Sequence, residues 1–242
     1  MSTRTIIPFG PQHPVLPEPI HLDLVLEDEK VVEAIPSIGF VHRGLESLAS
    51  KRNFNDYVYV FERICGICSF MHGMGYCEAV ERVLGGEIPE RAKYLRTIWC
   101  EMSRIHSHLL WLGLLADAFG FDALFMQCWR LRERVLDMFE ISTGGRVIFS
   151  VNKVGGVLKD MDSDMLKTFV KEFKAMEKEL KKTTDVFLNA NLTSCISVAL
   201  IACNYFKINI TVCSVAELSC VKLNARSAHH RADAAEFNCI LL

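Results

Sequence analysis

The sequence has no glycine and no proline after Gly156, although its 14 glycines and 7 prolines are spread over the part before it. Glycine and proline make up about 7% and 5% of an average protein, so a folded domain without either is unusual. A long helix explains part of this gap, but not residues 191–242. We therefore expect an anomalous tail at 191–242, produced by out-of-frame translation or an aberrant terminus.

Other absences exclude whole classes of protein. Lysine and arginine number 27 against 29 acidic residues, so no basic excess indicates nucleic-acid binding. The longest uncharged apolar stretch, 192–206, is interrupted by polar residues and is shorter than the about 20 residues that span a bilayer. Residues 1–14 lack the apolar region of a signal peptide. We expect no nucleic-acid partner, no membrane span and no secretion.

The 242 residues, half of them hydrophobic, are enough to bury a substantial core. Five prolines within residues 1–19 predict an extended segment. Alternating apolar residues at 20–26 and 31–35, separated by a polar turn, predict a β-hairpin.

Beyond the hairpin the apolar spacing is helical, and glycine or proline marks most of the boundaries. The predicted helices cover 44–50, 53–64, 68–84, 89–119, 123–141 and 162–189. The fold class is therefore mainly α with a small N-terminal β-hairpin. We expect an extended segment and hairpin at 1–35, a helical domain at 36–190 and the anomalous tail at 191–242.

The sharpest local motif is Cys65-Gly66-Ile67-Cys68. Two thiols at this spacing can bind one metal, and both the nearby Arg63 and a helix N-terminus favour thiolates. A structural zinc site needs further ligands, but there is no second CxxC, and His106 and His108 lie on different helix faces. A thioredoxin-like dithiol needs a preceding strand, and the flanks here are helical. Half of a binuclear metal site is the third interpretation.

Residues around this motif resemble one family. Glu62 to Cys68, followed by His72, is similar to the N-terminal nickel motif of [NiFe] hydrogenase large subunits. Three further strings resemble the branch shared by energy-converting (Ech-type) hydrogenases and the 49 kDa subunit of complex I: Gly10–Pro14, Val41–Glu46 and Glu101–Trp111. The resemblance extends from about Pro8 to about Asn189. Complex I subunits have lost the nickel cysteines, so the two cysteines here favour a hydrogenase.

The resemblance implies an incomplete hydrogenase-like helical bundle and a specific metal centre. In the family, four thiolates bind nickel, and an iron with CO and cyanide ligands shares two of them. Cys65 matches the thiolate terminal to nickel, and Cys68 matches one that bridges nickel and iron. His72 matches a donor to the bridging sulfur, and Arg63 flanks the centre. Such a centre splits H₂, and a terminal thiolate accepts the proton; no nucleotide is expected.

Two carboxylates are assigned by the same resemblance. Glu46 matches a group that supports a divalent cation such as Mg²⁺ or belongs to the proton path. Glu18 lies where relatives carry a proton-relay glutamate. Cys77, Cys100 and Cys128 lie beside apolar residues, and we expect them to pack in the core. We expect His106 and His108 to be helix-packing or polar-network residues rather than metal ligands.

The family also implies partners: an iron–sulfur small subunit, membrane-embedded ion-translocating subunits, and ferredoxin as an indirect electron partner. The expected location is the cytoplasm, peripheral to the cytoplasmic face of the cell membrane. Full-length relatives carry a second motif, DPCxxC, which this chain lacks, so we expect the chain alone to be inactive. Two alternatives stay open: a non-catalytic scaffold or quinone-site subunit like the complex I relatives, and a redox or zinc protein with a single CxxC.

Overall fold

The computed structural model describes residues 4–13, 16 and 18–189, so the predicted tail at 191–242 lies outside the described residues. The chain divides into two compact units, 1–54 and 55–242, and each is described by itself. Among the described residues, no helix is both long enough and apolar enough to cross a membrane.

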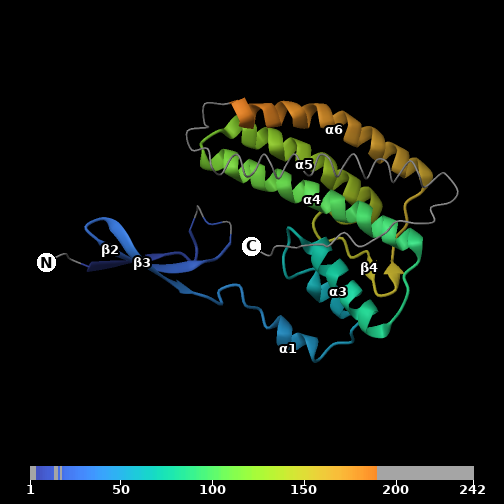
Figure 1. Cartoon of the computed structure of the whole chain (residues 1–242), viewed down its shortest axis with the longest axis horizontal. Helices are drawn as coiled ribbons and strands as arrows, with labels where there is room; N and C mark the ends of the chain where they lie inside the picture. Colours follow the sequence, from blue (N-terminus) through green and yellow to red (C-terminus); the bar gives the residue numbers. More distant parts are fainter. Residues whose placement is uncertain (1–3, 14–15, 17, 190–242) are drawn as a thin grey trace. The chain divides into compact units, whose positions relative to one another are not determined.

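The first unit contains a three-stranded antiparallel sheet in the order β1-β2-β3, followed by the short helix α1 (Figure 1). The elements cover β1 Arg4–Phe9, β2 His21–Glu27, β3 Lys30–Ser37 and α1 Leu45–Ala49. The predicted hairpin is confirmed as β2 and β3. Its turn places Asp28 and Glu29 at φ 47° and 69°, the left-handed conformations that suit a two-residue hairpin turn.

The strand β1 was not predicted, because the prolines around it indicated an extended segment without sheet pairing. Pro8 lies within this strand, opposite Asp23 of β2. An edge strand tolerates proline, because one side of it has no neighbour that needs the missing N–H group. Tertiary pairing therefore overrides the local signal here.

The second unit is helical. Its helices are α2 Tyr57–Phe61, α3 Ser69–Leu84, α4 Glu90–Ala118, α5 Asp122–Thr143 and α6 Ser163–Asn189. The three longest, α4 to α6, run side by side (Figure 1). Helix α2 is shorter than the predicted 53–64, since the chain leaves the helix at Glu62, whose carboxylate is buried.

An aromatic cluster forms the centre of this unit. Phe139 and Phe149 stack with ring centroids 3.8 Å apart, and the fully buried Trp99 donates from its indole N–H to Ser142. The imidazole of His106 meets both phenylalanines edge-on. His106 is thus a packing residue, one of its two expected roles, and the expected packing of the three cysteines at 77, 100 and 128 in the core is confirmed.

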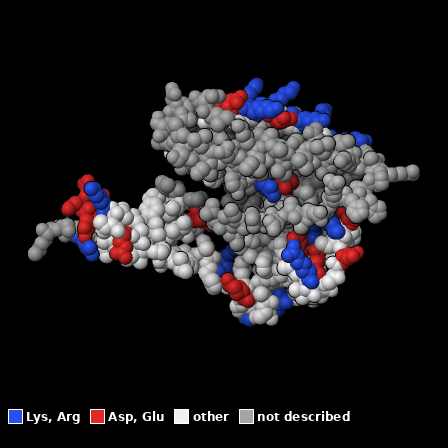
Figure 2. Space-filling model, in the orientation of Figure 1, with Lys and Arg blue, Asp and Glu red and all other residues white. Residues whose placement is uncertain are grey.

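Helix α6 packs by an apolar face and leaves its charges outside. Phe169 and Met176 are buried, whereas basic and acidic side chains lie together along its outer edge (Figure 2). Glu177 and Lys181, one turn apart on this helix, form an ion pair at 2.8 Å. On the inner side Arg134 of α5 bonds to Glu172 and Glu179 of α6, which ties the two helices together.

A short ribbon between α5 and α6 has no counterpart among the predicted elements. It consists of β4 Asn152–Lys153 and β5 Gly156–Val157, paired antiparallel. Gly155, in the turn, has φ +84°, a conformation open to glycine. Two-residue strands carry no detectable periodicity, so only their pairing with each other in the folded chain defines them.

Candidate metal centre

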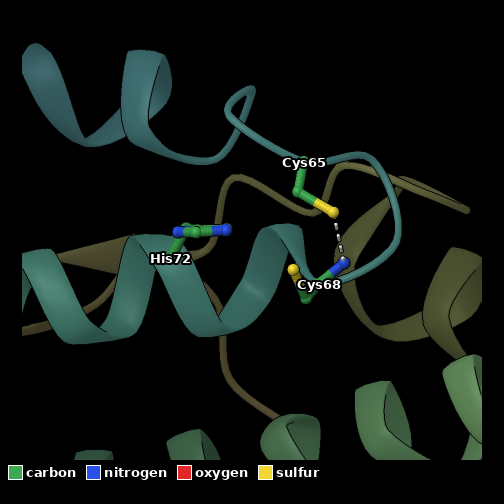
Figure 3. Close-up of side chains that lie close together, drawn as sticks. All are labelled: Cys65, Cys68 and His72. Carbon is green, nitrogen blue, oxygen red and sulfur yellow. Dashed lines mark hydrogen bonds between the residues drawn. The ribbon is translucent and has the colours of Figure 1, made fainter. Parts of the chain in front are cut away.

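The CxxC motif forms a loop between two helices. Helix α2 ends at Phe61 and α3 begins at Ser69, so Cys65 lies in the loop and Cys68 is the residue that precedes α3. His72 follows one turn into the helix, because four residues bring a helical side chain back to the same face. The ligand atoms of Cys65, Cys68 and His72 all lie within 4.8 Å of one another (Figure 3).

The N-terminus of α3 gives this loop a positive electrostatic character. The backbone N–H of Cys68 donates to the Sγ of Cys65 at 3.5 Å. Cys68 also stands at the N-cap of a 16-residue helix, where unpaired N–H groups and the helix dipole stabilise negative charge. Both features direct backbone N–H groups toward the sulfurs, as in sites where a helix N-terminus faces a metal-binding thiolate.

His72 is half-buried, and its burial lowers the pKa of the imidazole. The ring is therefore neutral at physiological pH, with a nitrogen lone pair available. Two thiols and a neutral imidazole form a soft donor set, which suits zinc, nickel or low-valent iron. Other described residues form no further cluster of three metal-binding side chains.

The other cysteines of the described part are unsuited to metal binding. Burial raises the pKa of Cys77 and of Cys100 to about 12 and that of Cys128 to about 11, so all three stay protonated. The remaining five cysteines fall at 195 and beyond, outside the described residues. The described part thus supplies two accessible cysteine ligands, Cys65 and Cys68, and their soft sulfur donors suit nickel or iron.

The predicted residue Arg63 is exposed and lies outside the three-residue group. Its guanidinium donates to the carbonyl of Tyr59, one turn earlier, at 2.7 Å. The neighbouring side chains of Ile64 and Ile67 are also exposed, so the outer surface of the loop is apolar apart from this arginine.

The predicted carboxylates Glu18 and Glu46 belong to the first unit, and both are exposed. The carboxylate of Glu46 lies 3.4 Å from the Nε2 of His42, one turn earlier. Neither glutamate forms part of the three-residue group in the second unit. Their assigned roles stay predictions.

Glu62 belongs to the sequence motif without a predicted role of its own, and the structure gives it a distinct position. Its side chain is fully buried, and its Oε2 accepts hydrogen bonds from the N–H and the hydroxyl of Ser150, both at 3.0 Å. In the sequence, the available signal for a role of Glu62 was its charge, three positions before the first cysteine. Its partner lies 88 residues away, which the sequence pattern does not reveal.

The mainly helical unit with its CxxC loop at the start of a helix has the arrangement expected of a hydrogenase-like large subunit. Two family descriptions match consecutive parts of the chain: "Nickel-dependent hydrogenase" at residues 43–117, and "Respiratory-chain NADH dehydrogenase, 49 Kd subunit" at 118–195. Residues 43–195 therefore carry the nickel-dependent hydrogenase and complex I 49 kDa family domains, as the motifs predicted.

Particular relatives come from both branches. The chain is 40% identical over 183 residues to the membrane-bound hydrogenase subunit alpha of Pyrococcus furiosus, covering 76% of this chain and 43% of that protein. It is 38% identical over 187 residues to formate hydrogenlyase subunit 5 of Escherichia coli, covering 77% and 33%. It is 34% identical over 188 residues to an NADH-quinone oxidoreductase subunit of Chloroherpeton thalassium, covering 76% and 43%.

A solved structure confirms the predicted fold class. A chain of the membrane-bound sulfane sulfur reductase, described as an archaeal respiratory membrane complex, superimposes with a TM-score of 0.74 at 31% identity. The match covers 78% of this chain and 51% of that one. The chain thus spans about half, or less, of the length of the relatives that it matches.

Proposed function

We propose that this chain is the N-terminal portion of a [NiFe] hydrogenase large subunit and that the loop at Cys65 and Cys68 holds part of its metal centre. The observation that carries the proposal is the convergence of two thiols and an imidazole within 4.8 Å, in a chain of the hydrogenase family. When bound, a nickel–iron centre with CO and cyanide on iron supplies the reversible oxidation of H₂ to protons and electrons.

Each side chain of the group has its own part in this proposal. Cys65 would be a nickel ligand, and its half-buried Sγ could take up a proton released from H₂. Cys68, at the N-terminus of α3, would be the second cysteine ligand, shared by nickel and iron. A ring nitrogen of His72 lies within 4.8 Å of both sulfurs, and the ring would tune the electron density at the metals by donating a hydrogen bond to a cysteine sulfur. Arg63 adds positive charge near the loop.

Glu18 and Glu46 are proposed for the proton path, with Glu46 alternatively supporting a Mg²⁺ ion. Both are acidic and exposed, so both can exchange protons with water. The resemblance of their sequence surroundings to the hydrogenase branch supports these roles.

The proposed partners are an iron–sulfur small subunit, membrane-embedded ion-translocating subunits and, indirectly, ferredoxin. The complex would lie on the cytoplasmic face of the cell membrane. Relatives named as membrane-bound hydrogenase and respiratory membrane-complex subunits support a place in such an assembly.

A second candidate function is a non-catalytic scaffold or quinone-site subunit. The match of residues 118–195 to the 49 kDa subunit of NADH dehydrogenase favours it. The third interpretation, a single-CxxC zinc or redox protein, rests on the three-residue group alone.

Metal content measured together with H₂ activity separates these functions. The chain is to be co-expressed with its partner subunits and maturation factors, and purified. Nickel plus iron supports the hydrogenase, no metal supports the scaffold, and zinc alone supports the third interpretation. Since the described part offers two of four thiolates, we expect the chain purified alone to show no H₂ activity. H₂ uptake by the chain alone would contradict that expectation.

A further inference from the structure

The loop that carries the candidate ligands has little packing of its own. Between Glu62 and Ser69, each residue from 63 to 68 is exposed or half-buried. Glu62 and Ser69 themselves are fully buried. The loop is therefore anchored at its two ends by buried residues.

The segment from Val147 to Asn152 holds both ends. Before the cysteines, Ser150 donates two hydrogen bonds to Oε2 of Glu62. After them, the hydroxyl of Ser69 donates to the carbonyl of Val147 at 2.6 Å. Ser150 has φ 50°, a left-handed conformation that is unfavourable for a residue with a side chain. This conformation aims both Ser150 donors at the same carboxylate oxygen.

The same carboxylate also contacts α3 directly. A Cβ placed on Gly73 would lie 2.7 Å from Cγ and 2.9 Å from Oε1 of Glu62, so only a glycine allows the helix to approach this closely. Gly73 is the residue after His72. Glu62 is thus in contact with the segment 147–152 on one side and with the helix that carries two of the candidate ligands on the other.

We propose that Glu62 is a positioning residue for the metal centre: bonded to Ser150 and packed against Gly73, it sets the distance between Cys65 and the two ligands of α3. The inference rests on the proposed function for its metal, although the distance between the thiols is a property of the chain itself. Outer-shell groups that orient ligands typically change metal affinity about 10–100-fold when removed.

Two substitutions separate positioning from simple stability. Glu62→Ala removes both hydrogen bonds and the contact with α3. Glu62→Gln keeps an amide oxygen that can accept from Ser150. Glu87→Gln is the control, because Glu87 is exposed and lies beyond the end of α3. Circular dichroism verifies that each variant is folded.

The first readout is the binding of Co²⁺ alone to the full chain. The sulfur-to-cobalt charge-transfer absorption reports this binding. We expect Glu62→Ala to weaken Co²⁺ binding about 10–100-fold, with Glu62→Gln and Glu87→Gln within about threefold of the unsubstituted chain. The second readout needs no metal: the equilibrium between free thiols and the Cys65–Cys68 disulfide in a glutathione buffer, located by peptide mass spectrometry. Glu62→Ala is expected to lower the effective concentration of one thiol at the other about tenfold.

The two readouts distinguish failure of the proposed metal site from failure of the positioning role of Glu62. An unsubstituted chain that binds no Co²⁺ overturns the metal site, and the disulfide equilibrium then decides the positioning role. Equal disulfide equilibria for Glu62→Ala and the unsubstituted chain overturn the inference. A Glu62→Gln variant that binds Co²⁺ as weakly as Glu62→Ala, and has the same disulfide equilibrium, also overturns the inference. The hydrogen-bond acceptor at residue 62 would then not determine the position of the ligands.

Discussion

The guanidinium of Arg96 and the carboxylate of Glu81 form a buried ion pair with two hydrogen bonds, of 2.7 and 3.0 Å. The pair joins α4 to α3, and both side chains are about 5% exposed or less. Arg96 also donates to the carbonyls of Lys153 and Gly156, and the N–H of Gly155 donates to Glu81. One ion pair thus holds two helices and the β4–β5 ribbon together.

Arg96→Ala is therefore expected to destabilise the second unit strongly. Removing one partner leaves the Glu81 carboxylate buried without its counter-charge, which typically costs about 3–5 kcal/mol. Urea unfolding followed by circular dichroism measures the loss. Lys181→Ala is the control, because its ion pair with Glu177 is exposed and its removal should leave the unfolding midpoint unchanged. An Arg96→Ala midpoint equal to that of the control would contradict the structural role.

Gly73 and Gly75 offer a matched pair within α3. Alanine at 73 forces a Cβ to within 2.7 Å of Glu62, and overpacking of this kind costs about 1–3 kcal/mol. Alanine at 75 meets nothing within 4 Å and should stabilise the helix by up to about 1 kcal/mol. Thermal melts of the two variants should shift in opposite directions. A shift of the same sign for both would refute the close contact.

The stability of the second unit should fall in acid because of His106. Burial, assisted by the positive charge of Arg132, lowers the pKa of this imidazole to about 4. An unfolded histidine binds a proton near pH 6.5, so between pH 6.5 and 4 the unfolded state takes up a proton that the folded state refuses. At about pH 4.5 this linkage costs about 2–3 kcal/mol relative to neutral pH.

His106→Leu tests this prediction, with urea unfolding at both pH values in the presence of a chelator. In this variant, the difference in unfolding free energy between neutral and acid pH should shrink by about 2–3 kcal/mol. The exposed His42 supplies the control, since His42→Leu should keep the full difference. An unchanged pH dependence in His106→Leu would rule out His106 as its source.

The five cysteines of the described part should differ sharply in alkylation. The raised pKa values of Cys77, Cys100 and Cys128 leave roughly one thiolate in a thousand or fewer at about pH 8. Brief treatment with iodoacetamide, followed by peptide mass spectrometry, should label the half-exposed Cys65 and Cys68 first. In denaturant all five should react at similar rates. Early labelling of Cys100 in the native state would show that the core is open there.

The sequence by itself determined most of the helical framework and the ligand motif. Glycines at 85, 120 and 144 mark helix ends, because a helix closes most easily on a residue that adopts positive φ, as all three do. The i, i+3 and i+7 spacing of Cys65, Cys68 and His72 was visible as a pattern. Local propensity and spacing were sufficient for these features because they depend on neighbours along the chain.

Only the tertiary structure decided what holds the motif in place. The bonds of Glu62 with Ser150, and of Arg96 with the ribbon, join residues 57 to 88 positions apart, and no local pattern records such pairs. The pairing of β1 with β2 likewise overrode the proline signal at Pro8. The physical reason is the same in each case: a buried polar group or an unpaired strand needs a partner, and folding, not spacing, supplies it.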